Sequence, residues 1–215
     1  GPGAEITTSE VMLSSAGSSG IIIESNSSST GSLIHHEYDL EATIERYVTG
    51  NSDLNANSYH TVSIPLTQDA SPQSALFMGS YLYEFDAVDQ TWNALGTSTT
   101  TSLNVDQGYL IYYPDNNTTY TFGGPMNNGE FSAASMPGGS GAHHLVPNPY
   151  PSAIDWDATS GWTKTALNDA IWIWSASSGN WASYISGTGT NGASQYIPVG
   201  QAFFVQASGA SPALT

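Results

Sequence analysis

The chain has 215 residues, and its formal net charge of -16 comes from 18 acidic residues against only two basic ones, Arg46 and Lys164. So few cations exclude a nucleic-acid surface built on phosphate contacts and a polybasic membrane anchor. A hydrophobic content of 39% with 11% aromatic residues is too high for a disordered acidic chain, so we expect a folded protein. Cysteine is absent, which excludes disulfides and thiolate metal sites.

The predicted strands are short β-branched and aromatic runs divided by Gly, Ser, Asn and Asp. They lie at residues 11–13, 20–24, 32–34, 43–48, 59–64, 81–85, 109–113, 119–122, 171–174 and 203–206. Only two segments, residues 70–77 and 163–170, are compatible with a helical turn or two. The sequence therefore predicts an all-β fold.

The N-terminal part, residues 6–48, differs from the rest because its strands recur about every ten residues between Ser- and Gly-rich turns. This spacing is compatible with β-solenoid rungs, with the edge of a sandwich or with plain antiparallel hairpins. We assign residues 1–54 to an N-terminal strand segment and leave these alternatives open.

An internal repeat organises the remainder of the chain. The aligned segments keep the same order: 59–65 with 143–149, 82–85 with 171–174, 89–92 with 178–181, and 106–112 with 198–204. Each unit contains a strand that ends near Pro, an aromatic hairpin that closes on Trp, and a Gly-led strand. We therefore predict a β-sandwich-like, internally duplicated module with two units of about 75 residues, at 55–138 and 139–215, packed as one globule.

The run VPNPYPSAIDW at residues 146–156 resembles the "GNPYPSAIDW" signature of secreted surface proteins of Bacteroidota, which the type IX system typically exports. Three further runs are similar to motifs of that family: ATIERYV at 42–48, YHTVSIP at 59–65 and IPVGQAFFVQA at 197–207. The resemblance covers most of residues 20–215 and departs from the signature at His144 and Pro147. It implies an extracellular β module of a large adhesin or polysaccharide-acting protein, and it brings no established catalytic residues.

Aromatic side chains are the candidate ligand-binding groups, because the apolar faces of sugar rings stack on aromatic planes. The candidates are Tyr150, Trp156, Trp162, Trp172, Trp174 and Trp181. On a strand at 171–174, Trp172 and Trp174 share one face and the two isoleucines share the other. If the isoleucines are inside, the two tryptophans form an exposed platform; otherwise they are core residues. Trp156 and Trp162 fall in a predicted loop, where they either contact a ligand or cap the end of the sandwich.

A calcium site is the metal hypothesis that the sequence supports. Asp155 and Asp157 supply hard oxygens at alternate positions, although the run lacks the Gly and Glu of an EF-hand loop. The five histidines do not suggest a metal site, because neighbours such as His143 and His144 face opposite ways on a strand. We expect either no cofactor or a structural Ca²⁺.

Catalysis is not expected. No spacing of carboxylates singles out an acid and a base, and the chain has no nucleophile elbow, zinc signature or phosphate loop. The leading hypothesis is a non-catalytic carbohydrate-binding or adhesion module of a larger surface protein that recognises neutral polysaccharide through Trp and Tyr stacking. The alternatives are a structural spacer or self-assembling fibre subunit, and a polysaccharide-degrading domain.

The sequence also predicts where the protein works and what it contacts. No apolar run reaches the about 20 residues that span a bilayer, and no charged segment followed by an apolar stretch opens the chain. We interpret the chain as a segment of an exported protein that works outside the cell or at its surface. The expected partners are a polysaccharide or cell-surface glycan, with self-association through strand edges as a further option and with nucleic acid and membrane insertion excluded.

Overall fold

The computed structural model describes residues 5–7 by their backbone and residues 20–50, 58–113 and 117–215 in full. The fold is all-β, and its helical elements include two short 3-10 turns, η2 (Gln68–Ala70) and η3 (Ser74–Phe77). Of the two segments compatible with a helical turn, 70–77 contains η3, whereas 163–170 contains β12 (Lys164–Thr165), which pairs with β18 (Ala213–Leu214). The strand expected at 11–13 lies outside the described residues. None of the described helices is long and apolar enough to cross a membrane.

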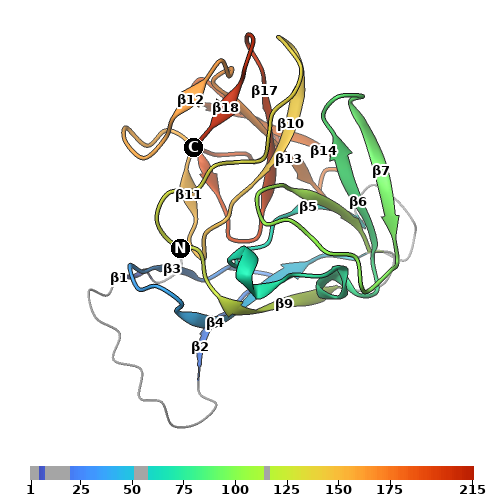
Figure 1. The fold of residues 1–215 in the computed structure, drawn as a ribbon, viewed down its shortest axis with the longest axis vertical. Helices are drawn as coiled ribbons and strands as arrows, with labels where there is room; N and C mark the ends of the chain where they lie inside the picture. The colour runs from blue at the N-terminus through green and yellow to red at the C-terminus, as the bar shows by residue number, and fades with distance from the viewer. Residues whose placement is uncertain (1–4, 8–19, 51–57, 114–116) are drawn as a thin grey trace.

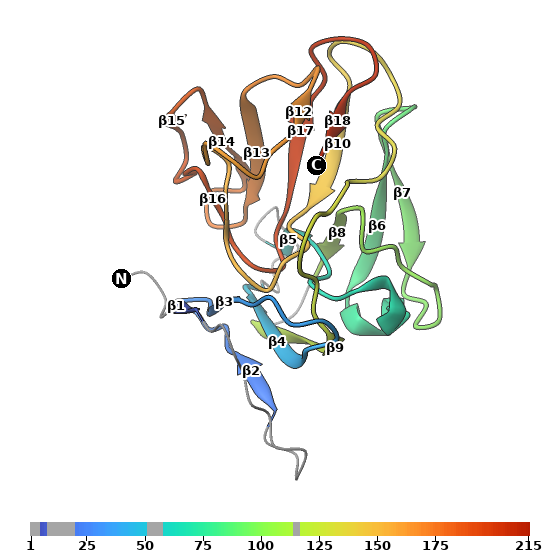
Figure 2. The ribbon, with the colours of Figure 1, turned by 60° about the vertical axis from the view of Figure 1, so that its left-hand side comes forward.

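Two antiparallel sheets carry the predicted duplication. The first repeat orders its strands β5 (Tyr59–Val62), β8 (Tyr109–Tyr112), β6 (Tyr81–Asp86) and β7 (Thr91–Gly96). The second orders β10 (His143–Pro147), β17 (Ala202–Gln206), β13 (Ala170–Ser175), β14 (Asn180–Ile185) and β15 (Thr188–Gly189). In both sheets the Gly-led strand of the repeat, β8 or β17, lies between its first strand and its aromatic hairpin. Figures 1 and 2 show the two sheets next to each other, the first repeat in teal to yellow-green and the second in yellow to red.

The pairing register of the strands corrects the sequence alignment of β8 with β17. Tyr83 of β6 lies opposite Leu110, and its counterpart Trp172 of β13 lies opposite Phe204. Leu110 is therefore equivalent to Phe204, whereas the sequence alignment had matched Tyr112 to Phe204. The error is two residues, so each side chain was still assigned to the correct face of its sheet.

The two repeats pack against each other through close backbone contacts. Gly108, before β8, donates its N–H to the Leu145 carbonyl (3.1 Å), and Ser63, after β5, donates to the Gly200 carbonyl (3.0 Å). A Cβ at Gly108 would lie 2.5 Å from the Ala202 Cβ, so only glycine allows this approach. The repeats are thus held together by main-chain hydrogen bonds in both directions.

The N-terminal strands belong to the first repeat's core. Strand β4 (Glu41–Val48) pairs antiparallel along its whole length with β9 (Thr118–Pro125), and their side chains Ile44 and Phe122 are fully buried. Strands β2 (Ile21–Ile23) and β4 pair in parallel, as do β1 (Glu5–Thr7) and β3 (Ser32–Ile34). Plain hairpins are therefore wrong for this segment, and its described strands do not close into solenoid rungs either.

The second repeat has a separate core, which includes Ile171, Ile197, Phe203 and Val205. Strands β11 (Ile154–Asp155) and β16 (Tyr196–Ile197) pair beside this core. A third, smaller cluster of apolar side chains lies between the repeats and contains residues of both, Phe85 and Trp92 from the first and Phe204 from the second. This third cluster is the part of the fold that positions the candidate site.

Candidate functional site

The side chains of strand β13 alternate between two faces of the sheet, as the sequence predicts. Ile171 is 1% exposed and Ile173 packs against the second core, whereas Trp172 lies in the cluster between the repeats. The aliphatic face of the strand is therefore the inside, and Trp172 and Trp174 share the opposite face. Both tryptophans are partly buried, and Trp172 packs against the same small cluster as Phe85 and Trp92 of the first repeat's hairpin.

A cleft of about 550 Å³ lies between the two repeats, and we call it the inter-repeat cleft. The hairpin of β6 and β7 supplies part of its wall, and the sheet of the second repeat supplies the rest. Its lining residues are Phe85, Gln90 and Trp92 from the first repeat and His143, Trp172, Trp181 and Phe204 from the second. Two of the predicted site residues, Trp172 and Trp181, are therefore brought into one cavity with aromatic residues of the other repeat.

The aromatic rings of the cleft fix one another by edge-to-face contacts. Phe204, which is 7% exposed, lies at the centre, with ring centroids 4.8 Å from Phe85, 5.9 Å from Trp92 and 5.2 Å from Trp181. Trp174 does not line the cleft and instead contacts Trp181 at 5.2 Å. Because only Phe204 of these residues is fully buried, the other rings keep part of their surface accessible in a fixed orientation.

Two polar side chains border the cleft. Gln90 donates through Nε2 to the His143 carbonyl (3.1 Å), and its Oε1 accepts the His143 backbone N–H (2.8 Å). Burial lowers the pKa of the His143 imidazole, so the ring is neutral at neutral pH. Its Nε2 lies 3.2 Å from the Gln206 amide nitrogen, which can only donate; we therefore assign the ring proton to Nδ1. Gln90 and His143 are thus the polar side chains among the lining residues of the cleft.

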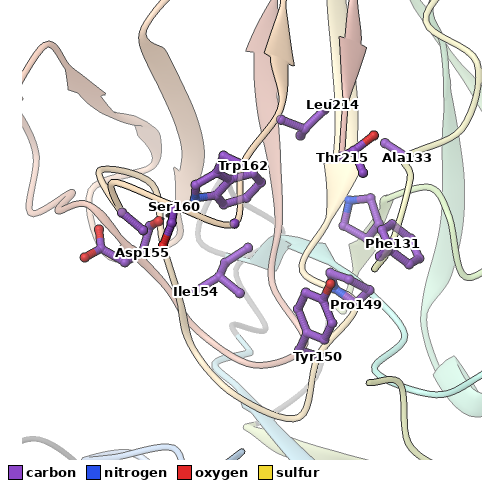
Figure 3. A pocket seen from close by; sticks show the side chains of 13 residues that line it. Phe131, Ala133, Pro149, Tyr150, Ile154, Asp155, Ser160, Trp162, Leu214 and Thr215 are labelled. Carbon is purple, nitrogen blue, oxygen red and sulfur yellow. Dashed lines mark hydrogen bonds between the residues drawn. The ribbon is translucent and has the colours of Figure 1, made fainter. Parts of the chain in front are cut away.

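A second cavity, which we call the loop groove, lies near the end of the second repeat (Figure 3). It has a volume of about 210 Å³ and is bordered by Phe131, Tyr150, Ile154, Asp155 and Trp162, among others. An adjoining cavity of about 480 Å³ shares three of these rings and adds Glu130. Two further predicted aromatics, Tyr150 and Trp162, therefore line a cavity of their own, separate from the inter-repeat cleft.

Backbone carbonyls hold the two predicted rings of the loop groove in place. Trp162 Nε1 donates to the Asp155 carbonyl (2.6 Å), and the Tyr150 hydroxyl donates to the Gly129 carbonyl (2.7 Å). Asn148 fixes the turn next to these rings, and its side chain is 0% exposed. Its oxygen accepts the Tyr150 N–H, and its amide nitrogen donates to the carbonyls of Ser152, Ile197 and Pro198. The signature-like run at 146–156 therefore builds a rigid loop around one buried asparagine.

Trp156 is a core residue, which corrects its assignment to the ligand-binding set. Its side chain is 0% exposed and packs against Phe203, with the ring centroids 6.0 Å apart. The indole Nε1 donates to Asp169 (3.0 Å), and Lys164 Nζ lies 3.6 Å from the ring centroid. A ligand has no access to this ring, because the loop folds back over the second core.

The two carboxylates of the calcium hypothesis have protein partners. Asp155 accepts the Asp157 backbone N–H (2.9 Å) and the Gln195 amide (3.2 Å), and Asp157 accepts the Tyr184 hydroxyl. In the described part of the chain, no group of three or more His, Cys, Asp or Glu side chains could hold a metal ion. Calcium binding stays a prediction without a preformed site to support it.

Comparisons with protein-family models, with curated proteins and with solved structures gave no match. The resemblance to secreted surface proteins therefore stays a prediction. Sequence reasoning did not assign Phe85, Gln90, Trp92, His143 and Phe204 to a site. The repeat alignment held a signal for one of them, because it matches Trp92 to Trp181.

Proposed function

We propose that this chain is a non-catalytic, extracellular carbohydrate-binding module whose inter-repeat cleft holds a neutral polysaccharide. The observation that carries the proposal is that five aromatic side chains from two repeats line one cavity: Phe85, Trp92, Trp172, Trp181 and Phe204. A pyranose ring offers apolar C–H faces to such rings, and its hydroxyls hydrogen-bond to the few polar groups beside them.

The rigidity of the cleft supports the same function. Edge-to-face contacts hold the rings in position before a ligand arrives, and Gln90 ties the hairpin of the first repeat to His143 of the second. A preformed site loses little conformational entropy on binding, which matters for a polymer that forms few strong contacts per sugar unit.

The charge of the chain selects among polysaccharides. With a formal net charge of -16, the protein repels acidic glycans at long range, whereas neutral glycans are unaffected by the field. Binding through ring stacking and hydroxyl contacts also predicts weak dependence on salt concentration, in contrast to a site based on ion pairs.

Retention on insoluble glycans tests the proposal. The protein is incubated with cellulose, xylan and chitin, with and without calcium, and the bound fraction is compared for the wild type and for Trp92→Leu. Tyr196→Ala is the matched control, because Tyr196 is an aromatic residue 58% exposed outside the cleft. We expect at least one neutral glycan to retain the wild type and the control but not Trp92→Leu.

Two results would overturn this proposal. Absence of retention on every glycan would favour the structural spacer or fibre subunit. Release of new reducing ends from a retained glycan would contradict the non-catalytic assignment and favour a polysaccharide-degrading domain.

A further inference from the structure

We propose that the loop groove is a second ligand site, independent of the inter-repeat cleft, and that it binds a small organic cation with a quaternary ammonium group. The proposal goes beyond polysaccharide binding and does not depend on it. It is based on the rings that form the walls, the carboxylates at the edge and the way the chain already holds one of its own cations.

Three aromatic rings, those of Phe131, Tyr150 and Trp162, form part of the wall of the groove. The polar atoms of Trp162 and Tyr150 are already bound to backbone carbonyls, and Phe131 has none. Figure 3 shows Trp162 across the opening from Phe131 and Tyr150, and the centroids of the last two rings lie 6.5 Å apart. Aromatic faces on two sides of an opening suit a cation that has no N–H groups to satisfy.

The carboxylates at the groove favour positive charge. Asp155 lines the groove, and its carboxylate accepts the Asp157 N–H and the Gln195 amide and points away from the rings in Figure 3. Glu130 lines the adjoining cavity, where its negative charge, together with the larger effect of burial, raises the pKa of the Tyr150 hydroxyl. Lys164 lines neither cavity. A neutral sugar gains nothing from these charges, and an anion is repelled by them. A cation is attracted by the two carboxylates and by the net charge of the whole chain.

The chain already uses the same chemistry for Lys164 beside the groove. The ammonium lies 3.6 Å from the centroid of Trp156 and 5.5 Å from that of Trp162, and it donates to the Trp156 carbonyl. Burial lowers the pKa of Lys164, and the nearby carboxylates of Asp169, Asp157 and Asp155 oppose that effect. Three carboxylates outnumber this one ammonium, so the region keeps an excess of negative charge that a ligand cation neutralises.

A quaternary ammonium fits the groove better than a primary one. A primary ammonium is strongly hydrated and needs three acceptors, whereas the lining of the groove is mainly apolar and includes Ile154, Leu214 and Pro149. A trimethylammonium head is weakly hydrated and contacts ring faces directly. The volume of about 210 Å³ accommodates such a head with a short chain.

The test is isothermal titration of the whole chain with choline and with 3,3-dimethylbutan-1-ol, a neutral molecule of the same shape. We expect choline to bind with a dissociation constant in about the millimolar range and the neutral molecule to bind at least about fivefold more weakly. Equal affinity for both, or no binding of choline, would overturn the proposal.

Two variants test whether Glu130 and Trp162 contribute to choline binding. Glu130→Gln removes one charge from a side chain at the surface and should weaken choline binding about two- to fivefold. Trp162→Leu should weaken it further, and urea unfolding shows whether that variant folds. If Trp162→Leu fails to fold, Phe131→Leu replaces it.

A variant in the other cavity separates this proposal from the proposed function. Trp92→Leu should abolish polysaccharide retention and leave choline binding unchanged, because Trp92 lines only the inter-repeat cleft. Loss of choline binding in Trp92→Leu would contradict an independent site in the loop groove. Choline binding by a wild type that retains no glycan would leave this proposal standing while the polysaccharide proposal fails.

Discussion

Gln90 and His143 join the two repeats by two hydrogen bonds that follow the pattern of a β-bridge, from the Gln90 side-chain amide to the His143 backbone. Gln90 adopts a left-handed backbone conformation with φ of 55°, and the equivalent turn position in the second repeat is Gly179, with φ of 59°. An L-residue is strained in this conformation, whereas glycine is not. The contact with His143 explains why the first repeat has a glutamine at this turn.

Substitution of Gln90 separates the effect of the backbone strain from that of the hydrogen bonds to His143. Gln90→Ala and Gln90→Gly both remove the hydrogen bonds to His143, but only glycine relieves the strained conformation. We expect Gln90→Gly to be more stable than Gln90→Ala by about 1 kcal/mol, with Gln90→Ala less stable than the wild type. Urea unfolding of the three proteins measures both differences. Equal stability of the two variants would contradict the strain at this turn.

Asn148 offers an isosteric test of the signature-like loop. Asn148→Asp keeps the shape of the side chain but replaces a donor to three carbonyls by an acceptor that repels them. We expect a loss of about 3 kcal/mol or more, because buried polar atoms lose their partners and a charge is buried. Asn104→Asp is the control, since that side chain is exposed and should change stability by less than about 0.5 kcal/mol. A similar effect of both variants on urea unfolding would refute the role given to Asn148.

The burial of Trp156 predicts a stability effect without a binding effect. Trp156→Phe keeps an aromatic ring against Phe203 but loses the hydrogen bond to Asp169 and leaves a small void. We expect a loss of about 1–3 kcal/mol in the free energy of unfolding and unchanged retention on glycans. If retention disappeared while stability stayed the same, Trp156 would have to contact the ligand.

His60 makes stability depend on pH. Burial lowers the pKa of the imidazole from 6.5 to about 4, against an opposing hydrogen bond to the Thr49 carbonyl and with a smaller contribution from the charge of Arg46. The unfolded chain takes up a proton near pH 6.5 and the folded protein does so near pH 4, so this contribution is complete above pH 6.5 and is lost as the pH falls toward 4.

The difference between the folded and unfolded pKa values of His60 corresponds to at most about 3 kcal/mol in the free energy of unfolding. His60→Gln retains a donor for the Thr49 carbonyl and does not titrate, so the stability of this variant should fall less than that of the wild type between pH 6.5 and 4. Unfolding by urea at several pH values measures the two slopes. Parallel slopes would show that His60 is protonated equally in both states.

The duplication could be predicted because each repeat shows its own local signals. The hairpins close on Trp92 and Trp181 after turns of equal length, and the structure places these hairpins at the same position in both sheets. The two-residue error in the alignment of β8 with β17 arose because Gly108 was matched to Gly200. The two glycines serve different needs: Gly108 allows close contact with Ala202, and Gly200 has a positive φ.

The candidate site was less predictable, because it depends on contacts between distant segments. Alternation along β13 placed Trp172 and Trp174 on one face, but it could not show that Trp172 lines a cavity together with Phe85 of the other repeat. For the same reason a loop position did not reveal the burial of Trp156, whose neighbour Phe203 comes from β17. Burial of an aromatic residue is a property of the assembled sheets rather than of its own segment.

Migration in native gels that contain soluble neutral polysaccharides tests most directly whether both repeats form one binding cleft. Hydroxyethylcellulose, a soluble xylan and galactomannan are compared with gels without polysaccharide, for the wild type, Trp92→Leu, Trp181→Leu and Tyr196→Ala. At least one polysaccharide should retard the wild type and Tyr196→Ala equally, and each tryptophan variant should bind at least about tenfold more weakly, because Trp92 and Trp181 come from different repeats. Retardation that both tryptophan variants retain would contradict the cleft.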